Sequence, residues 1–259
     1  MPQNKNKNKN KSKLKWHQRW WGVIILVVFV VLLIYLAVFI YQVILLIEIK
    51  TQSNIQGFNT LSQNINDNPI LSVNNRQVAE TKDDPYWGPV DAEVVIVEFA
   101  DFQCPFCKQA NPIIQQIRQE YKDQVKIIYR DFVDAASHPQ ALNAAMAAEC
   151  ADEQGEFWSY HDMIFSNQAN LSIEKFKSIA VTLGLDTEQF NKCLDDKKYS
   201  FEVFNDLEDG AKLGITGTPA FFINGSKIEG VIPHDTFKEI IDRALFLQEQ
   251  EKQKQENNK

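Results

Sequence analysis

Residues 94–107 read VVIVEFADFQCPFC, and this stretch decides the fold. Its first seven residues are almost entirely apolar and rich in β-branched side chains, which predicts a buried strand. The Cys-Pro-Phe-Cys sequence follows at once, and a helix is expected from about Pro105 to Tyr121. Residues 126–132 predict a second strand. A strand, a helix and a strand within about 40 residues indicate a βαβ unit with parallel strands.

The rest of the chain completes an α/β domain. From Ser137 to about Leu213 the pattern is helical, with apolar residues at helical spacing in five successive segments. Residues 219–230 predict a β-hairpin whose tight turn is Asn224-Gly225. A closing helix is expected from Asp235 to about Gln248, so the order is βαβ, a helical insert at about 137–213, and ββα. We expect this domain at residues 83–250, followed by a disordered tail at residues 251–259.

The N-terminal segment differs in charge from the rest of the chain. Residues 1–21 contain seven of the 27 Lys and Arg residues and no acid, and their Lys-Asn alternation is typical of disorder. The remainder has 20 basic and 34 acidic residues, a formal charge of −14. A basic head on an acidic body argues against nucleic-acid binding by the body.

An apolar run at residues 22–47 is long enough to cross a membrane. As a helix, 26 residues span roughly 39 Å, against a hydrocarbon core of about 30 Å. A cleaved signal peptide has a shorter apolar core and a small-residue cleavage site, so we expect an uncleaved anchor instead. Because Lys and Arg stay on the cytoplasmic side, the N-terminus is expected in the cytoplasm. The domain would then lie outside the cell membrane on a polar linker at residues 48–82.

The close pair Cys104 and Cys107 predicts a redox dithiol. A helix N-terminus stabilises a thiolate through its free N–H groups and its dipole. Cys104 is expected at the N-cap, with Pro105 at the first helical position, where a missing N–H costs nothing. Cys104 would be the attacking thiol, and Cys107, one turn inside, would resolve the mixed disulfide. A plain structural disulfide is the alternative for this pair.

The other two cysteines, Cys150 and Cys193, lie in the helical insert. In an oxidising compartment they favour a structural disulfide, and two separate buried thiols are the alternative. A zinc site would need a second close Cys pair or a suitable His spacing, so we expect no metal and no cofactor.

Four separated segments resemble the DsbA-like disulfide-bond oxidoreductases of the thioredoxin superfamily, in particular their membrane-anchored bacterial members. The resemblance spans about residues 83–247 and rests on residues 97–107, 147–150, 157–161 and 217–225. It implies a thioredoxin fold with a helical insert. It also implies that Cys150 pairs with Cys193, as the corresponding cysteines do in relatives of this type.

The resemblance also implies roles for residues outside the cysteine motif. Thr218-Pro219 would form a cis bond beside the dithiol, and the Thr218 main chain would pair with an extended substrate. Glu98 would be a buried acid that passes protons to and from Cys107, and the alternative is an ordinary strand residue at the end of the sheet. His138 and His161 are interpreted as helix-start or packing residues.

One position departs from the family pattern. The strongest oxidases of the family have His as the second residue between the cysteines, and this chain has Phe106. Phenylalanine cannot stabilise the Cys104 thiolate by charge or hydrogen bonding, so a milder oxidant is expected. Phe106 would also add apolar surface for docking unfolded chains.

We therefore expect a membrane-tethered thiol–disulfide oxidoreductase that acts on exported proteins with thiols or disulfides. A membrane redox partner, plausibly quinone-linked, would reset the dithiol. A reductase or isomerase of the same fold is the alternative within this class. A non-catalytic anchored binding module is the alternative outside it.

Overall fold

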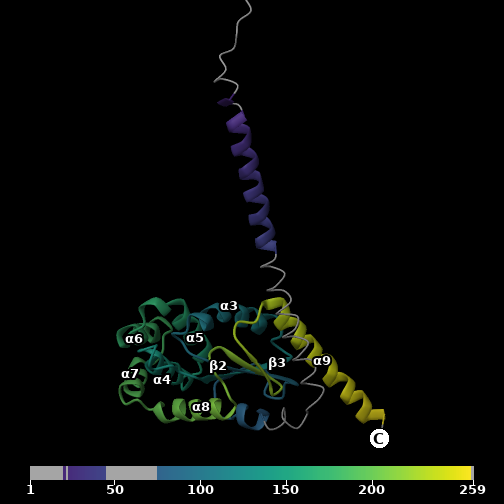
Figure 1. Ribbon diagram of the computed structural model, residues 1–259. Helices are drawn as coiled ribbons and strands as arrows, with labels where there is room; N and C mark the ends of the chain where they lie inside the picture. Colours follow the sequence, from purple (N-terminus) through teal and green to yellow (C-terminus); the bar gives the residue numbers. More distant parts are fainter. Residues whose placement is uncertain (1–19, 22, 45–74, 258–259) are drawn as a thin grey trace, which may run out of the picture. The chain divides into compact units, whose positions relative to one another are not determined.

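The computed structural model of the protein describes residues 20–21, 23–44 and 75–257, which fall in two units (Figure 1). In the first unit, residues 1–60, the helix Val23–Ile44 has a mean hydropathy of 3.6 and is long and apolar enough to cross a membrane. It lies within the predicted span. The predicted basic tail and most of the predicted linker lie outside the described residues.

The second unit, residues 61–259, is built on a mixed five-stranded sheet in the order β1-β3-β2-β4-β5. The predicted βαβ unit is confirmed. Strand β2 (Val94–Ala100) leads into helix α3 (Pro105–Glu120), and β3 (Val125–Asp131) returns parallel to β2. Both strands are buried almost throughout, which explains their nearly unbroken apolar sequences.

The predicted hairpin is also confirmed. Strands β4 (Ala220–Ile223) and β5 (Ser226–Glu229) pair antiparallel, and β4 pairs with β2. Asn224 and Gly225 have φ values of 47° and 82°, as a two-residue hairpin turn of this hand requires. The Asn224 side chain also accepts a hydrogen bond from the Val95 N–H at 2.9 Å, which ties the turn to β2.

Helices cover both faces of the sheet (Figure 1). Helix α3 and helix α9 (His234–Asn257) lie on one face, where Phe237 of α9 packs against Phe221. The other face of the sheet carries Val97, Phe99 and Phe222. It is covered by a short helix at residues 75–79 and by the end of helix α8 (Ser200–Lys212).

Between β3 and β4 lies the predicted helical insert. It consists of α4 (Ala141–Asp152), α5 (Phe157–Ser166), a 3₁₀ turn η1 (Gln168–Asn170), α6 (Ile173–Thr182), α7 (Thr187–Asp195) and α8. Helix α4 is buried along nearly its whole length and contacts α5, α6, α7 and α8. Its many alanines let these neighbours approach closely.

Three boundaries differ from the sequence prediction. Strand β1 (Tyr86–Trp87) was not predicted, and it pairs antiparallel with β3. Residues 75–82, predicted as linker, belong to the folded unit, since Ala79 is fully buried and the Val78 carbonyl accepts a hydrogen bond from Arg130 at 2.8 Å. Helix α9 continues to Asn257, so residues 251–257 are helical and not the predicted disordered tail.

Candidate active site

The dithiol lies at the start of α3, as predicted. Cys104 is the N-cap residue, with extended backbone angles (φ −66°, ψ 124°), and Pro105 opens the helix. The Cys104 carbonyl accepts the Lys108 N–H at 3.1 Å, the first hydrogen bond of the helix. Cys104 retains 5% exposure and Cys107 has none, so Cys104 is the thiol that another molecule can reach.

The surroundings shift the two thiols in opposite directions. A hydrogen bond from the Cys107 thiol, helped by backbone N–H groups of Phe106 and Cys107, lowers the pKa of Cys104 to about 5 against the opposing effect of burial. Burial, together with the neighbouring Cys104, raises the pKa of Cys107 well above 9.0. At neutral pH Cys104 is therefore a thiolate and Cys107 a thiol, which is the protonation pattern of a nucleophile with a resolving partner.

The loop before β4 closes over the dithiol, as the sequence prediction required. Cys104 Sγ lies 3.3 Å from the Thr218 carbonyl oxygen, which accepts a hydrogen bond from Cys104 when the thiol is protonated, and the Thr218–Pro219 peptide bond is cis. Pro219 is buried and its carbonyl accepts the Gly230 N–H at 2.8 Å, which fixes the loop to the end of β5. Phe106, by contrast, is 56% exposed beside the accessible cysteine.

Glu98 is buried in β2, between Tyr129 and Phe221 of the neighbouring strands. Burial raises its pKa to about 8, although the charge of Arg118 on α3 opposes the shift. One carboxyl oxygen of Glu98 has no hydrogen-bond partner among the described residues. The charges of both Glu98 and Cys107 contribute to the raised pKa of Tyr129, so both groups lie near this phenol. Glu98 is thus a largely protonated carboxyl group at neutral pH.

Sequence analysis missed the residues that hold the active-site loop. The Asp101 side chain accepts the Gln103 and Asp134 N–H groups at 2.7 and 2.9 Å and contacts His138 Nδ1 at 2.8 Å. From the insert, the Gln168 amide donates to the carbonyls of Phe102 and Cys104 at 2.8 and 2.9 Å. Asp101 and Gln103 could have been noticed as polar residues between a buried strand and the motif, but their partners lie far away in sequence.

The two histidines of the insert have different surroundings. His161 is buried among the rings of Phe102, Tyr129 and Phe157, and burial lowers its pKa, so it is a neutral packing residue as predicted. His138 is only partly buried and contacts the active-site loop through Asp101. The prediction that His138 has only a helix-start or packing role overlooks this contact.

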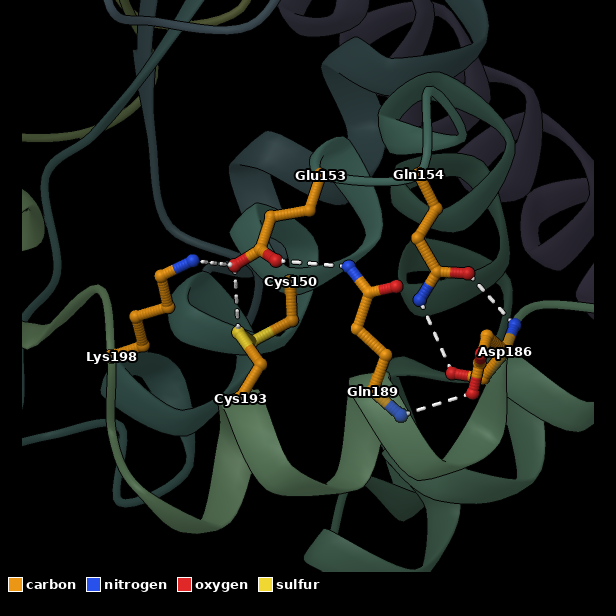
Figure 2. Close-up of a disulfide and its surroundings, with 7 residues drawn as sticks. All are labelled: Cys150, Glu153, Gln154, Asp186, Gln189, Cys193 and Lys198. Carbon is orange, nitrogen blue, oxygen red and sulfur yellow. Dashed lines mark hydrogen bonds and ion pairs between the residues drawn. A yellow bond between two sulfur atoms is a disulfide. The ribbon is translucent and has the colours of Figure 1, made fainter.

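Cys150 of α4 and Cys193 of α7 form a disulfide with an S–S distance of 2.01 Å, which confirms the predicted pairing. Figure 2 shows Glu153 beside it, between the Lys198 ammonium at 2.6 Å and the Gln189 amide at 3.1 Å. Next to this group, Asp186 caps α7 by accepting the N–H groups of Glu188 and Gln189 at 3.0 Å. The disulfide therefore joins two helices of the insert.

Comparison with known proteins places this geometry in a family. Residues 62–243 match the family described as Thioredoxin. A Na⁺/H⁺ antiporter NhaA of Salinispora tropica is 36% identical over 143 residues, which are 55% of this chain but only 22% of the antiporter. The chain thus matches about a fifth of the length of such curated relatives.

Solved structures agree with the family match. Oxidised BdbD from Bacillus subtilis superposes with a TM-score of 0.58 at 26% identity, covering 64% of this chain and 95% of that one. A thioredoxin-like oxidoreductase from Silicibacter pomeroyi gives 0.56 at 25% identity, covering 65% and 96%. The thiol–disulfide exchange protein α-DsbA2 from Wolbachia pipientis, at 24% identity, shares the fold with a TM-score of 0.61, covering 67% and 93%. The chain therefore belongs to the thioredoxin family, and its unit at residues 61–259 has the fold of the DsbA-like thiol–disulfide oxidoreductases.

Proposed function

We propose that this protein is a membrane-tethered thiol–disulfide oxidoreductase that introduces or exchanges disulfides in exported proteins through Cys104 and Cys107. The observation that carries the proposal is the opposite shift of two neighbouring thiols. Cys104 is accessible and has a pKa of about 5, whereas Cys107 is buried behind it with a raised pKa. A purely structural disulfide does not require its two thiols to differ in pKa and accessibility.

In the oxidising direction, a substrate thiolate attacks Cys104 Sγ in the Cys104–Cys107 disulfide. A substrate–Cys104 disulfide forms, and Cys107 leaves with the electron pair and takes up a proton. A second substrate thiolate then attacks the substrate sulfur of the mixed disulfide and releases Cys104 as its stable thiolate. The substrate loses two electrons, which the dithiol gains.

Glu98 supplies the proton that Cys107 needs. It is mostly protonated at neutral pH, with its pKa near 8, and it shares the phenol of Tyr129 as a neighbour with Cys107. In the reverse direction the Glu98 carboxylate takes the proton back, so that Cys107 can attack the mixed disulfide.

Substrates bind as extended segments beside the loop that precedes β4. The Thr218 carbonyl lies 3.3 Å from Cys104 Sγ, so main-chain groups of Thr218 and Pro219 are next to the reacting sulfur. An extended chain can pair with such groups irrespective of its side chains. The exposed ring of Phe106 adds an apolar contact.

The apolar helix of the first unit and the disulfide of the insert support the proposed cellular arrangement. The helix Val23–Ile44 anchors the chain, with the basic residues 1–21 in the cytoplasm. The Cys150–Cys193 disulfide supports an extracytoplasmic location for the second unit, because such bonds persist in oxidising compartments. A membrane redox partner, of a quinone-linked type, resets the dithiol.

The low pKa of Cys104 favours the oxidase direction, because a stable thiolate makes the disulfide more oxidising. Phe106 favours the alternative, a reductase or isomerase of the same fold, because the motif lacks the stabilising His. The reduction potential of the purified protein separates the two. A value well above that of thioredoxin, roughly −270 mV, is expected, and a value near it would refute the oxidase direction.

Trapping in cells tests the activity itself. The variant Cys107→Ser is expected to accumulate mixed disulfides with exported proteins, because the resolving thiol is gone. The matched variant Cys104→Ser should trap none. A failure of Cys107→Ser to trap substrates would instead support a non-catalytic binding module.

A further inference from the structure

The strongest unexplained feature beside the dithiol is the Asp101–His138 pair. Asp101 follows β2 directly and is completely buried, and His138 comes from the loop before α4, with its ring partly exposed. The Asp101 Oδ2 atom lies 2.8 Å from His138 Nδ1. Through its backbone, Asp101 also contacts both cysteines, since its carbonyl accepts the Cys104 N–H at 3.0 Å and its N–H points to Cys107 Sγ at 3.5 Å.

Three acidic groups from different segments act electrostatically on His138. They are Asp101 after β2, the Cys104 thiolate at the start of α3, and Asp134 in the loop after β3. Burial disfavours the charged imidazole, but the hydrogen bond to Asp101 and these three charges raise the pKa of His138 overall. Electrostatic interaction is reciprocal, so the His138 cation in turn stabilises the Cys104 thiolate.

We infer that His138, held in place by Asp101, supplies the positive charge for the Cys104 thiolate that Phe106 cannot supply from within the motif. This inference rests on the proposed function and deepens it. Neither His138 nor Asp101 touches the substrate, so both are positioning residues. At Cys104 the hydrogen bonds from Cys107 and Thr218 and from the start of α3 are the larger causes of thiolate stability. The expected contribution of His138 is therefore smaller than theirs.

The inference predicts a particular pH dependence. The His138 cation exists below its pKa, which lies above the ordinary imidazole value of 6.5. The additional stability of the reduced form is therefore present at mildly acidic pH and is lost as pH rises through the pKa of His138. As pH rises through this range, the protein becomes a weaker oxidant than a variant with a permanent positive charge at position 138 would be.

The test compares full-length protein in detergent micelles, equilibrated with glutathione buffers at several pH values. His138→Gln keeps a side-chain donor for Asp101 but has no charge. At about pH 6 we expect it to lower the equilibrium constant for oxidation of glutathione about two- to fivefold, or roughly 10 to 20 mV. At a pH well above the pKa of His138, where the wild-type imidazole is neutral, the two proteins should agree. His138→Lys carries a charge at both pH values, and it should retain the wild-type value at about pH 6 and exceed the wild-type value at the higher pH.

His234→Gln is the matched control, because this histidine at the start of α9 contacts Glu120 and Asp235 and not the active-site loop. It should behave as wild type. Equal constants for wild type and His138→Gln at about pH 6, or a difference that does not change with pH, would overturn the inference. If His138→Gln does not fold, the comparison of wild type with His138→Lys decides, since the potential of the wild type must show an inflection above about pH 6.5 that His138→Lys lacks.

These outcomes are distinct from a failure of the proposed function. If wild-type protein does not exchange disulfides with glutathione at any pH, the proposed function is wrong, and the inference falls with it. If wild-type protein exchanges disulfides but His138→Gln matches it throughout, only the role of His138 is wrong.

Discussion

Replacing Glu98 by Gln should stabilise the folded protein and slow its chemistry at the same time. The side chain is buried in β2, and burial raises its pKa from 4.5 to about 8. Between these values the folded protein keeps a proton that the unfolded chain releases, so stability falls as pH rises. Glutamine has nearly the same shape and carries no titratable proton, so it removes this pH dependence.

The size of the effect follows from the two pKa values. From pH 4.5 to pH 7 a single such group costs about 1.4 kcal/mol per pH unit, or about 3 kcal/mol in total. Below pH 4.5 the cost disappears, because the carboxyl group is protonated in both states. The difference in unfolding free energy between Glu98→Gln and wild type should therefore grow by about 3 kcal/mol over this range. The buried amide can add a further difference, but that contribution does not change with pH.

Urea unfolding of residues 61–259 at a series of pH values measures this difference. Glu239→Gln is the control, because Glu239 is exposed on α9, and it should leave the pH profile unchanged. Stopped-flow reaction of the oxidised protein with a thiol peptide should be at least about tenfold slower for Glu98→Gln, since the proton donor for Cys107 is gone. Parallel pH profiles for wild type and Glu98→Gln would refute the buried, raised-pKa carboxyl group, and an unchanged rate would refute its role as proton donor.

Three further predictions concern the disulfide, a buried ion pair and the motif. The Cys150→Ala/Cys193→Ala variant lacks a bond that closes a loop of 43 residues, so its unfolding free energy in urea titrations should fall by up to about 4 kcal/mol. Its glutathione exchange at Cys104 should persist. Arg130→Met should lower the unfolding free energy by about 3 to 5 kcal/mol, since it leaves Asp84 and Asp206 buried without their partner. Thermal unfolding should show a smaller loss of stability at acidic pH, where both carboxyl groups are protonated. Phe106→His should make the dithiol more oxidising by about a factor of ten in glutathione equilibration, or roughly 30 mV, and an unchanged constant would show that the motif position does not face the thiolate.

The elements predicted correctly are those with strong local patterns. The apolar runs of β2 and β3 and the turn residues Asn224 and Gly225 carry their own structural preference, so their positions follow from local sequence. Strand β1 has only two residues, and it exists because β3 offers a free edge at Ile127 and Ile128, which no local pattern reveals.

The end of α9 shows a different limit. Residues 249–257 have no apolar stripe, and a polar segment of this kind reads as coil in the sequence. In the structure it continues the helix, with a Gln253–Glu249 hydrogen bond at 3.0 Å and an ion pair between Lys252 and Glu93. The second contact depends on the tertiary arrangement and could not be predicted from the segment itself.

In the candidate site, too, the features that depend on local sequence could be predicted and those that depend on distant residues could not. Cys104, Cys107 and the role of the helix start follow from chemistry that acts within one turn of helix. The contact of His138 with Asp101 joins residues 37 positions apart, and the local sequence around either residue does not predict the contact. The burial of titratable residues such as Arg130, Asp131 and Glu149 could not be predicted either, because residues of these types are expected at the surface until their partners are known.

The central claim is that Cys104 is a stabilised thiolate with a protonated Cys107 behind it. The most direct test is the alkylation rate of each cysteine in the reduced full-length protein as a function of pH, with the modified residue identified by mass spectrometry. We predict that Cys104 alone reacts at neutral pH and that its rate has a midpoint near pH 5. Equal labelling of both cysteines, or a midpoint for Cys104 near the ordinary thiol value of 9.0, would contradict the claim.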